Sequence, residues 1–307
     1  MQKPKVVIIK GKDAEQMVEK SLSFLGGIKQ VIRPGDVVLV KPNLTAVWPG
    51  MNPGVVTNTR IVRSIISLAQ GVKAGEVIVG EGSGGADTEE AYEISGIKEI
   101  AREFGVRLLD FNKEESIEVI CPEWKVLKKI RIAKVALESD VIINLPVLKT
   151  THPPFFVTLG MKNMMGVLPG KGIYYDRYFS AEYLANKGFW EATGEKKIIH
   201  DSGKLSQAVV DLNIALKADL TIVDGIVGLE DGGPVKGSPI EMNLIITGIN
   251  PVAVDAVSAT IMGFDPVKIN YLRFAAKQGL GPCNLNDIDV VGETISDIQR
   301  KFKPYKP

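Results

Sequence analysis

Two stretches early in the chain decide the expected fold: residues 36–43 read DVVLVKPN, and residues 76–85 read EVIVGEGSGG. Each starts as a short β-branched run and ends in polar or glycine residues, which is typical of a buried strand that runs into a loop. Between them, residues 57–69 repeat apolar side chains at helical spacing. This succession of strand, helix and strand predicts a βα unit of a mostly parallel sheet.

The same alternation continues outward from these stretches. Asp13 and Gln16 form a capping-box pattern at the start of a helix over residues 14–25. Further strands are expected at 6–9, 106–109, 141–144, 220–223, 244–247 and 288–291, and further helices at 87–104, at 204–217 and after Asn250. The sequence therefore predicts an α/β fold with a Rossmann-like, mostly parallel sheet. We expect one unit over 1–307, and a division into α/β lobes 1–125 and 126–307 stays open.

One aromatic-rich segment interrupts this pattern. Residues 172–190 hold seven of the chain's twenty aromatic side chains without clear strand alternation. They are interpreted as an insertion, either a packed surface subdomain or a lid or arm that covers a site or forms a homodimer.

Composition narrows the class of protein. The 307 residues carry a net charge of +1 with 45% hydrophobic residues, which excludes disorder and coiled coil and argues against a nucleic-acid partner. No apolar stretch approaches the length of a signal sequence core or a membrane span, so we expect a cytoplasmic protein without a membrane partner. Cys121 and Cys283 are far apart and form no CxxC pair, so no iron–sulfur cluster is expected.

The polar residues of interest follow predicted strands, where open α/β sheets gather ligands. Residues 80–85 formally match G-x-G-x-x-G, which leaves a nucleotide site, a small-anion site and a tight turn as alternatives. Both histidines, His152 and His200, occur in polar loop settings, which suits a divalent metal site or an acid and base pair. Asp255 lies in an apolar run, so it requires a lysine, backbone amides or a metal as partner.

These observations give one set of candidate site residues, expected to converge on one crevice. The predicted catalytic residues are Lys149, His152, Lys162 and His200, with His152 and His200 also the candidate metal ligands. The predicted substrate-binding residues are Lys41, Asn43, Glu81, Gly82, Ser83, Gly84, Asn163, Asp224 and Asp255.

The motifs resemble the DUF362 family of uncharacterised α/β proteins over nearly the whole chain. The resemblance rests on KPNL at 41–44, GEGSG at 80–84, LPVLKT at 145–150 with His152, GMKNMMG at 160–166, VDG at 223–225, GP at 233–234 and PVAVD at 251–255. Two departures are an additional threonine, Thr151, before His152 and the aromatic segment before His200. Many relatives append ferredoxin-like cysteine motifs that this chain lacks, so the resemblance implies a separate iron–sulfur partner protein at most.

A more distant similarity links the chain to the lactate racemase family. That family also runs from a Rossmann-like glycine loop to a strand, a histidine and a Gly/Lys/Pro-Gly segment, here His152 through Lys162 to Pro169 and Gly170. Fold alone does not transfer chemistry.

The leading hypothesis is an enzyme that acts on a small anionic metabolite by metal-assisted proton transfer or isomerisation. In this hypothesis Lys149 and Lys162 bind the anion, and Glu81 and Asp255 orient the reacting groups. One alternative is a non-catalytic protein that binds a metal or a redox partner. Another is a nucleotide-dependent oxidoreductase that uses the glycine loop.

Overall fold

The computed structural model describes residues 2–151, 153, 155–169 and 202–305. His152, His200 and the aromatic segment 172–190 lie outside the described residues, so the expectations placed on them stay predictions.

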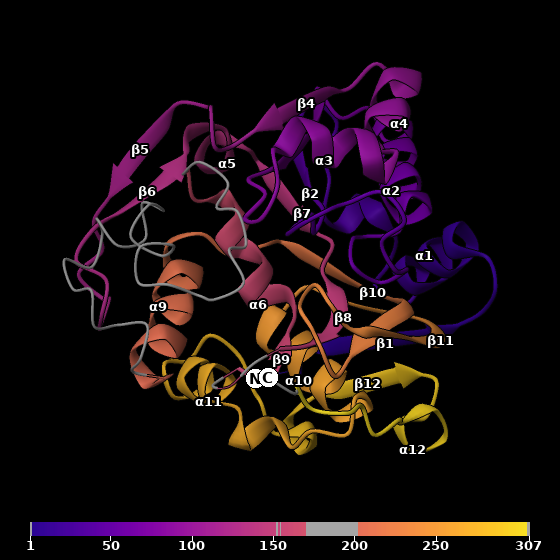
Figure 1. The fold of residues 1–307 in the computed structure, drawn as a ribbon, viewed down its shortest axis with the longest axis vertical. Helices are drawn as coiled ribbons and strands as arrows, with labels where there is room; N and C mark the ends of the chain where they lie inside the picture. Colours follow the sequence, from indigo (N-terminus) through magenta and orange to yellow (C-terminus); the bar gives the residue numbers. More distant parts are fainter. Residues whose placement is uncertain (1, 152, 154, 170–201, 306–307) are drawn as a thin grey trace.

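A mixed sheet forms the centre of the described structure (Figure 1). Its strands run in the order β12-β1-β11-β10-β7-β2-β3-β4, and β8 pairs with β10 and β9. Their bounds are β1 Lys5–Lys10, β2 Val37–Lys41, β3 Glu76–Glu81, β4 Arg107–Asp110, β7 Val141–Asn144, β8 Val147–Thr150, β9 Val157–Thr158, β10 Leu220–Glu230, β11 Ser238–Gly248 and β12 Asp289–Gly292. A separate antiparallel pair joins β5 (Ser116–Val119) to β6 (Ile130–Ala133). The predicted α/β class with a mostly parallel sheet is confirmed.

Five parallel strands define the Rossmann-like part of the sheet. In chain order β2, β3, β4, β7 and β10 take the spatial order β4-β3-β2-β7-β10, and each neighbouring pair is parallel. The chain moves outward from β2 in one direction and then returns to continue from β7 in the other. Ligands bind at such a reversal because the loops leave adjacent strands toward opposite faces and open a crevice there.

Helices cover both faces of the sheet. Those bounded here are α1 Ala14–Ser23, α2 Thr59–Gly71, α3 Thr88–Ser95, α4 Ile97–Phe104, α5 Lys134–Glu138, α6 Gly160–Asn163, α9 Ser202–Ala215, α10 Pro251–Ile261, α11 Asn270–Lys277 and α12 Ile295–Ile298, with 3₁₀ turns η1 Ile28–Gln30, η2 Met164–Val167, η4 Pro266–Lys268 and η5 Leu285–Asp287. Figure 1 shows α1, α2 and α4 together on the right, whereas α9 and α11 lie at the lower left.

Strand alternation explains this layering. Val38 and Val40 of β2 pack into the core beneath α1 and α2, whereas Leu39 between them packs into the opposite core with Leu212 of α9. Successive side chains of a strand point to opposite faces, so an uninterrupted apolar run fits a strand that is buried on both sides.

The structure corrects four details of the expected elements. Strand β1 lies outside the parallel run, between antiparallel β11 and parallel β12. The helix expected over 87–104 is two helices, because Gly96 adopts the left-handed conformation at φ 81°. Residues 147–150, expected as loop, form β8. Strands β10 and β11 are longer than expected because they pair with each other as a hairpin.

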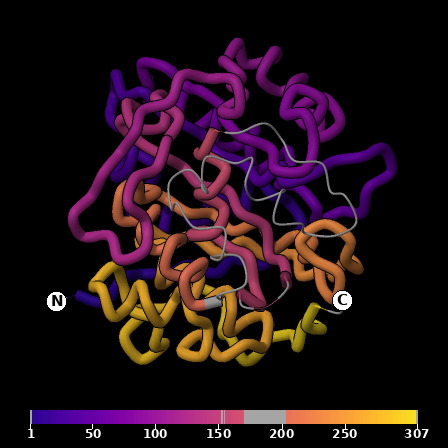
Figure 2. The backbone as a smooth tube through the Cα atoms, turned by 60° about the vertical axis from the view of Figure 1, so that its left-hand side comes forward, coloured from indigo at the N-terminus to yellow at the C-terminus, as the bar shows by residue number. Residues whose placement is uncertain are grey.

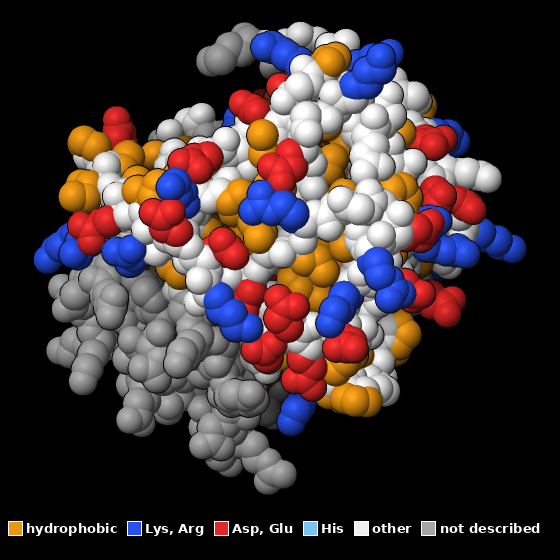
Figure 3. Space-filling model, turned by 90° about the horizontal axis from the view of Figure 1, so that it is seen from above, with side chains coloured by type: hydrophobic (Ala, Val, Ile, Leu, Met, Phe, Trp, Pro, Cys, Tyr) orange, Lys and Arg blue, Asp and Glu red, His pale blue; other side chains and the backbone are white. Residues whose placement is uncertain are grey.

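A strand near the start of the described chain, β1, pairs with one near its end, β12, although the two termini are labelled on opposite sides of the molecule in Figure 2. On the face drawn in Figure 3, basic and acidic side chains are interspersed over the described surface. Within the described residues, no helix has both the length and the apolar character that crossing a bilayer requires.

Candidate functional site

Side chains from five strands and their loops meet where the strand order reverses between β2 and β7. Lys41 ends β2, Glu81 ends β3 and Asn144 ends β7, while Lys149 lies on β8 and Asp224 on β10. All five are buried. The parallel direction of β2, β3, β7 and β10 brings these groups to one edge of the sheet, as the sequence pattern indicated.

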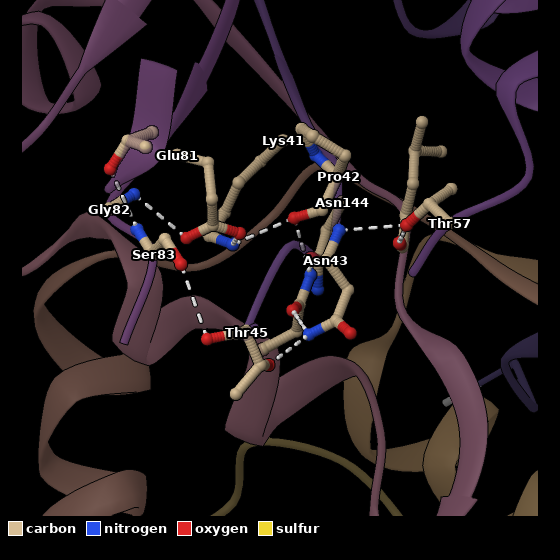
Figure 4. Close-up of polar contacts among 12 residues, drawn as sticks. Lys41, Pro42, Asn43, Thr45, Thr57, Glu81, Gly82, Ser83 and Asn144 are labelled. Carbon is tan, nitrogen blue, oxygen red and sulfur yellow. Dashed lines mark hydrogen bonds and ion pairs between the residues drawn. The ribbon is translucent and has the colours of Figure 1, made fainter. Parts of the chain in front are cut away.

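Lys41 and Glu81 form a buried ion pair across two neighbouring strands. The Nζ of Lys41 lies 2.7 Å from Oε2 of Glu81 and also donates to the carbonyl oxygen of Pro42 (Figure 4). Oε1 of Glu81 accepts from the backbone N–H of Gly82. Burial lowers the pKa of Lys41, whereas the charge and hydrogen bond of Glu81 act in the opposite direction. The charge of each buried side chain is therefore balanced by the other, without the need for a bound ion.

Gly166 allows this pair to be covered by backbone. A Cβ at this position would lie 1.8 Å from Oε1 of Glu81 and 2.7 Å from Nζ of Lys41. The carbonyl oxygen of Gly166 also accepts from the N–H of Gly82. Only glycine fits here, because any side chain would occupy the space of the carboxylate.

Three asparagine side chains connect the loop after β2 to the short helix α6. Asn43 donates from Nδ2 to Oδ1 of Asn163, and Asn163 donates from Nδ2 to Oδ1 of Asn144. Asn144 donates in turn to the carbonyl oxygen of Gly160 at 2.8 Å. Each amide both donates and accepts in this chain, so the orientation of Asn43 beside Lys149 is fixed by its neighbours.

Lys149 is buried among neutral oxygens. Its Nζ lies 2.5 Å from Oδ1 of Asn43, 2.7 Å from the carbonyl oxygen of Val55 and 3.4 Å from that of Pro234. Among the described residues, no carboxylate oxygen lies within ion-pair distance of it. Burial lowers the pKa of Lys149 to about 7, although the charges of Asp224 and Glu81 act in the opposite direction.

Asp224 is the buried carboxyl group on the adjoining strand. Its oxygens accept from the backbone N–H of Asn58 at 2.7 Å and of Ile226 at 3.0 Å. Burial raises the pKa of Asp224 to about 6, against these two hydrogen bonds and the charge of Lys149, which lower it. Asp224 and Lys149 therefore both titrate close to neutral pH.

Asp255 holds the start of α6. Its two oxygens accept from the backbone N–H of Gly160 at 2.7 Å and of Met161 at 3.0 Å, and the hydroxyl of Tyr271 donates to it at 3.3 Å. Burial raises the pKa of Asp255 to about 7, and these three donors oppose the shift. Of the partners anticipated for this carboxylate, the structure shows backbone amides. Asp255 thus acts on the site through the helix that carries Lys162 and Asn163.

The glycine loop after β3 uses most of its amides within the protein. The N–H of Ser83 donates to Oγ1 of Thr88, and that of Gly85 donates to the carbonyl oxygen of Thr45. The hydroxyl of Ser83 also reaches this carbonyl (Figure 4). The N–H of Gly82 is bonded to Glu81. Of the loop N–H groups from Gly82 to Gly85, this leaves that of Gly84 to bind a phosphate in the described structure. Its position after β3 also differs from the first βα turn that carries a dinucleotide fingerprint.

The remaining candidates have different surroundings. Lys162 is half-buried, with its Nζ 5.3 Å from the ring centroid of Phe155. His152 and His200 are outside the described residues. Within the described ranges, no three His, Cys, Asp or Glu side chains are grouped as a metal site.

Sequence reasoning missed several groups that build this site. The sequence pattern places Asn144 as the last residue of a predicted strand, and a polar residue that ends an apolar strand is itself a signal. Thr57 accepts from the N–H of Asn43 and donates to the carbonyl oxygen of Leu145, which ties two loops together. The contacts of Val55, Pro234 and Tyr271 carry no such signal, because they depend on tertiary packing.

Comparison with known proteins gives one family model and one curated relative that match much of the chain. The model of the family described as "Domain of unknown function (DUF362)" matches residues 38–260. A thylakoid-associated protein of Synechocystis sp. is 28% identical over 263 residues, which cover 85% of this chain and 74% of that protein.

Two solved structures show lower similarity. A Thermotoga maritima protein has a TM-score of 0.47 at 14% identity, covering 88% of this chain and 60% of its own. The lactate racemase apoprotein of Thermoanaerobacterium thermosaccharolyticum has a TM-score of 0.47 at 12% identity, covering 85% and 57%. This chain thus spans less than two thirds of either structure. Because the family model matches well over half of the sequence, as the quoted motifs predicted, the chain belongs to the DUF362 family.

Proposed function

We propose that the chain is an enzyme that binds a small anion at the β2–β7 reversal and moves a proton there, with Lys149 as the acid and base. One observation carries the proposal: Lys149 is buried where the strand order reverses, among neutral oxygens, and its pKa is about 7. An acid or base works best when its pKa lies near the operating pH.

The electrostatics of the site favour an anionic ligand. A buried ammonium without a contacting carboxylate is costly, and an opposite charge placed beside it stabilises the charged form. A bound carboxylate or phosphate would therefore raise the pKa of Lys149 and draw a proton onto it. Lys41 does not offer the same advantage, because Glu81 already neutralises it.

Other predicted roles remain part of the proposal. Lys162 would add positive charge from α6, and Asp255 would hold that helix in place. His152 and His200 would serve as a further acid and base, or as ligands of a divalent metal that assists the proton transfer.

Thermal unfolding with ligands tests the proposal. We expect a small carboxylate or inorganic phosphate to raise the Tm at pH 6.5, and the rise to fade toward pH 9 as Lys149 loses its proton. Lys149→Met should abolish the rise. Stabilisation of the wild type by NAD(P) or FAD would indicate the nucleotide-dependent alternative instead, and stabilisation by a divalent metal alone would indicate metal handling.

A matched control separates binding from general damage. Asp211 on α9 is equally buried and accepts from the backbone N–H groups of Lys125, Val126 and Leu127. Asp211→Asn therefore exchanges one oxygen of a buried carboxylate for an amide nitrogen without touching the site, and it should keep the anion response at a lower Tm. If both variants lose the response, or if the wild type shows none, the proposal is wrong.

A further inference from the structure

We infer that Lys149 is a nucleophile that forms an imine with the carbonyl carbon of a small 2-oxo acid. This inference rests on the proposed function, because it uses the same lysine and the same class of anionic ligand. It adds a covalent step and a substrate class to the proposed site.

The first argument compares two buried lysines at one edge of the sheet. Lys41 and Lys149 are 0% and 1% exposed, so both have lost the solvation that water gives an ammonium. The carboxylate of Glu81, 2.7 Å from Nζ of Lys41, stabilises the ammonium of Lys41 in place of water. From the described part of the chain, Lys149 contacts an amide oxygen and two carbonyl oxygens. An amine attacks a carbonyl only in its neutral form, and desolvation without a counter-charge is how proteins produce that form.

The second argument is the hydrogen-bond geometry of the nitrogen. An ammonium has three N–H donors, whereas a neutral amine has two and one lone pair. The contacts to Asn43 and Val55 are short, at 2.5 and 2.7 Å, and the contact to Pro234 is long, at 3.4 Å. Loss of one proton therefore gives up only the weakest contact. The two short bonds keep the nitrogen in place, and attack on a carbonyl carbon would require the substrate to displace the long contact to Pro234.

The third argument is the proton balance of the step. The nitrogen of Lys149 attacks the carbonyl carbon, and the carbonyl oxygen takes up the proton that the nitrogen loses. The resulting hydroxyl receives a second proton and leaves as water, so that a protonated C=N bond remains. This cation withdraws electrons from an adjacent C–H bond, which then releases its proton. Asp224 lies on β10, which pairs with the strand of Lys149, and in this proposal its carboxyl group supplies the second proton and takes up the one that the C–H bond releases.

The test traps the imine in the wild-type protein. Folded protein is incubated at pH 7 with glyoxylate and sodium cyanoborohydride, which reduces an imine to a stable secondary amine, and the modified lysines are mapped by peptide mass spectrometry. Before the anion binds, about half of Lys149 is neutral at this pH, against roughly one part in a thousand or less of an ordinary lysine. We expect Lys149 to be modified at least about ten-fold faster than the exposed Lys268, and Lys41 to stay unmodified.

Two comparisons make the outcome decisive. Lys149→Arg should remove the adduct at this position and leave modification of Lys268 unchanged. A wild type in which Lys268 reacts and Lys149 does not, or in which Lys41 reacts as fast as Lys149, overturns the inference.

Glycolate, which has a hydroxyl group in place of the carbonyl of glyoxylate, distinguishes this failure from failure of the proposed function. If glycolate and glyoxylate raise the Tm equally and no adduct forms at Lys149, the anion site stands and the covalent step is wrong. If neither raises the Tm and no adduct forms, both are wrong.

Discussion

The Nζ of Lys149 lies 2.5 Å from Oδ1 of Asn43, although 106 residues separate them in the chain. Asn43 follows β2 and Lys149 lies on β8, so this bond crosses the point where the strand order reverses. The bond joins the amide chain of Asn43, Asn163 and Asn144 to the lysine that the proposed chemistry uses. Changes at either end of this arrangement are therefore expected to affect both stability and ligand binding.

Removing one partner of the Lys41–Glu81 pair should be strongly destabilising. Lys41→Met and Glu81→Gln each leave one buried group without its partner, and each should lower the free energy of unfolding by about 3–5 kcal/mol. The double variant should cost less than the sum of the two, because it leaves no uncompensated charge. Urea unfolding of the four proteins measures this coupling. Strict additivity would show that the two side chains do not stabilise each other.

Gly166→Ala should disturb the Lys41–Glu81 pair by placing a methyl group against it. The new methyl group would overlap Oε1 of Glu81, so the pair or the turn η2 must shift, and we expect a loss of about 3 kcal/mol in the free energy of unfolding. Gly71→Ala is the matched control, because no atom lies within 4 Å of its new Cβ at the end of α2. That variant should gain up to about 1 kcal/mol from helix propensity. Equal effects of the two substitutions would contradict the assigned contact.

Lys149 should make stability depend on pH above neutrality. Its folded pKa of about 7 is below the ordinary lysine value of 10.5, so the unfolded chain binds more protons between these two values. Through this group, the free energy of unfolding rises with pH in that window by up to about 1.4 kcal/mol per pH unit. Below pH 7 the full cost of the buried charge remains. Lys149→Met lacks this contribution. The free energy of unfolding of the wild type, measured in urea, should therefore rise relative to that of the variant between pH 7 and 9. A constant difference would show that Lys149 titrates normally.

Asp255 should make stability fall with rising pH below neutrality, opposite to the effect of Lys149. Its folded pKa of about 7 is above the ordinary value of 3.8, so the folded protein binds more protons between pH 4 and 7. Stability therefore falls as pH rises through this window, and Asp255→Asn should flatten the fall by as much as about 1 kcal/mol per pH unit. Tyr271→Phe removes one donor but keeps the carboxyl group, so it should retain the slope. A slope that is the same in wild type and Asp255→Asn would exclude this titration.

The local elements of the fold could be predicted because their signals are local. Asp13 caps α1 by accepting from the N–H of Gln16, and Asn250 caps α10 with Pro251 in its first turn, as the residues indicated. The apolar run of β2 fixes a strand buried on both faces, because its side chains alternate between two cores. The polar residues that follow the strands meet at one edge because parallel strands share a direction.

Contacts between distant segments were decided only by the tertiary structure. Residues 147–150 carry no clear strand signal, and they form β8 because β10 and β9 offer their backbone groups. Sequence alone indicated that Asp255 needed a partner, and it left a lysine, backbone amides and a metal open. The structure gives Lys149 the oxygens of Asn43, Val55 and Pro234, and gives Asp255 the amides of α6. A side chain's partner depends on which segments pack together, whereas its tendency toward helix or strand depends on its immediate neighbours.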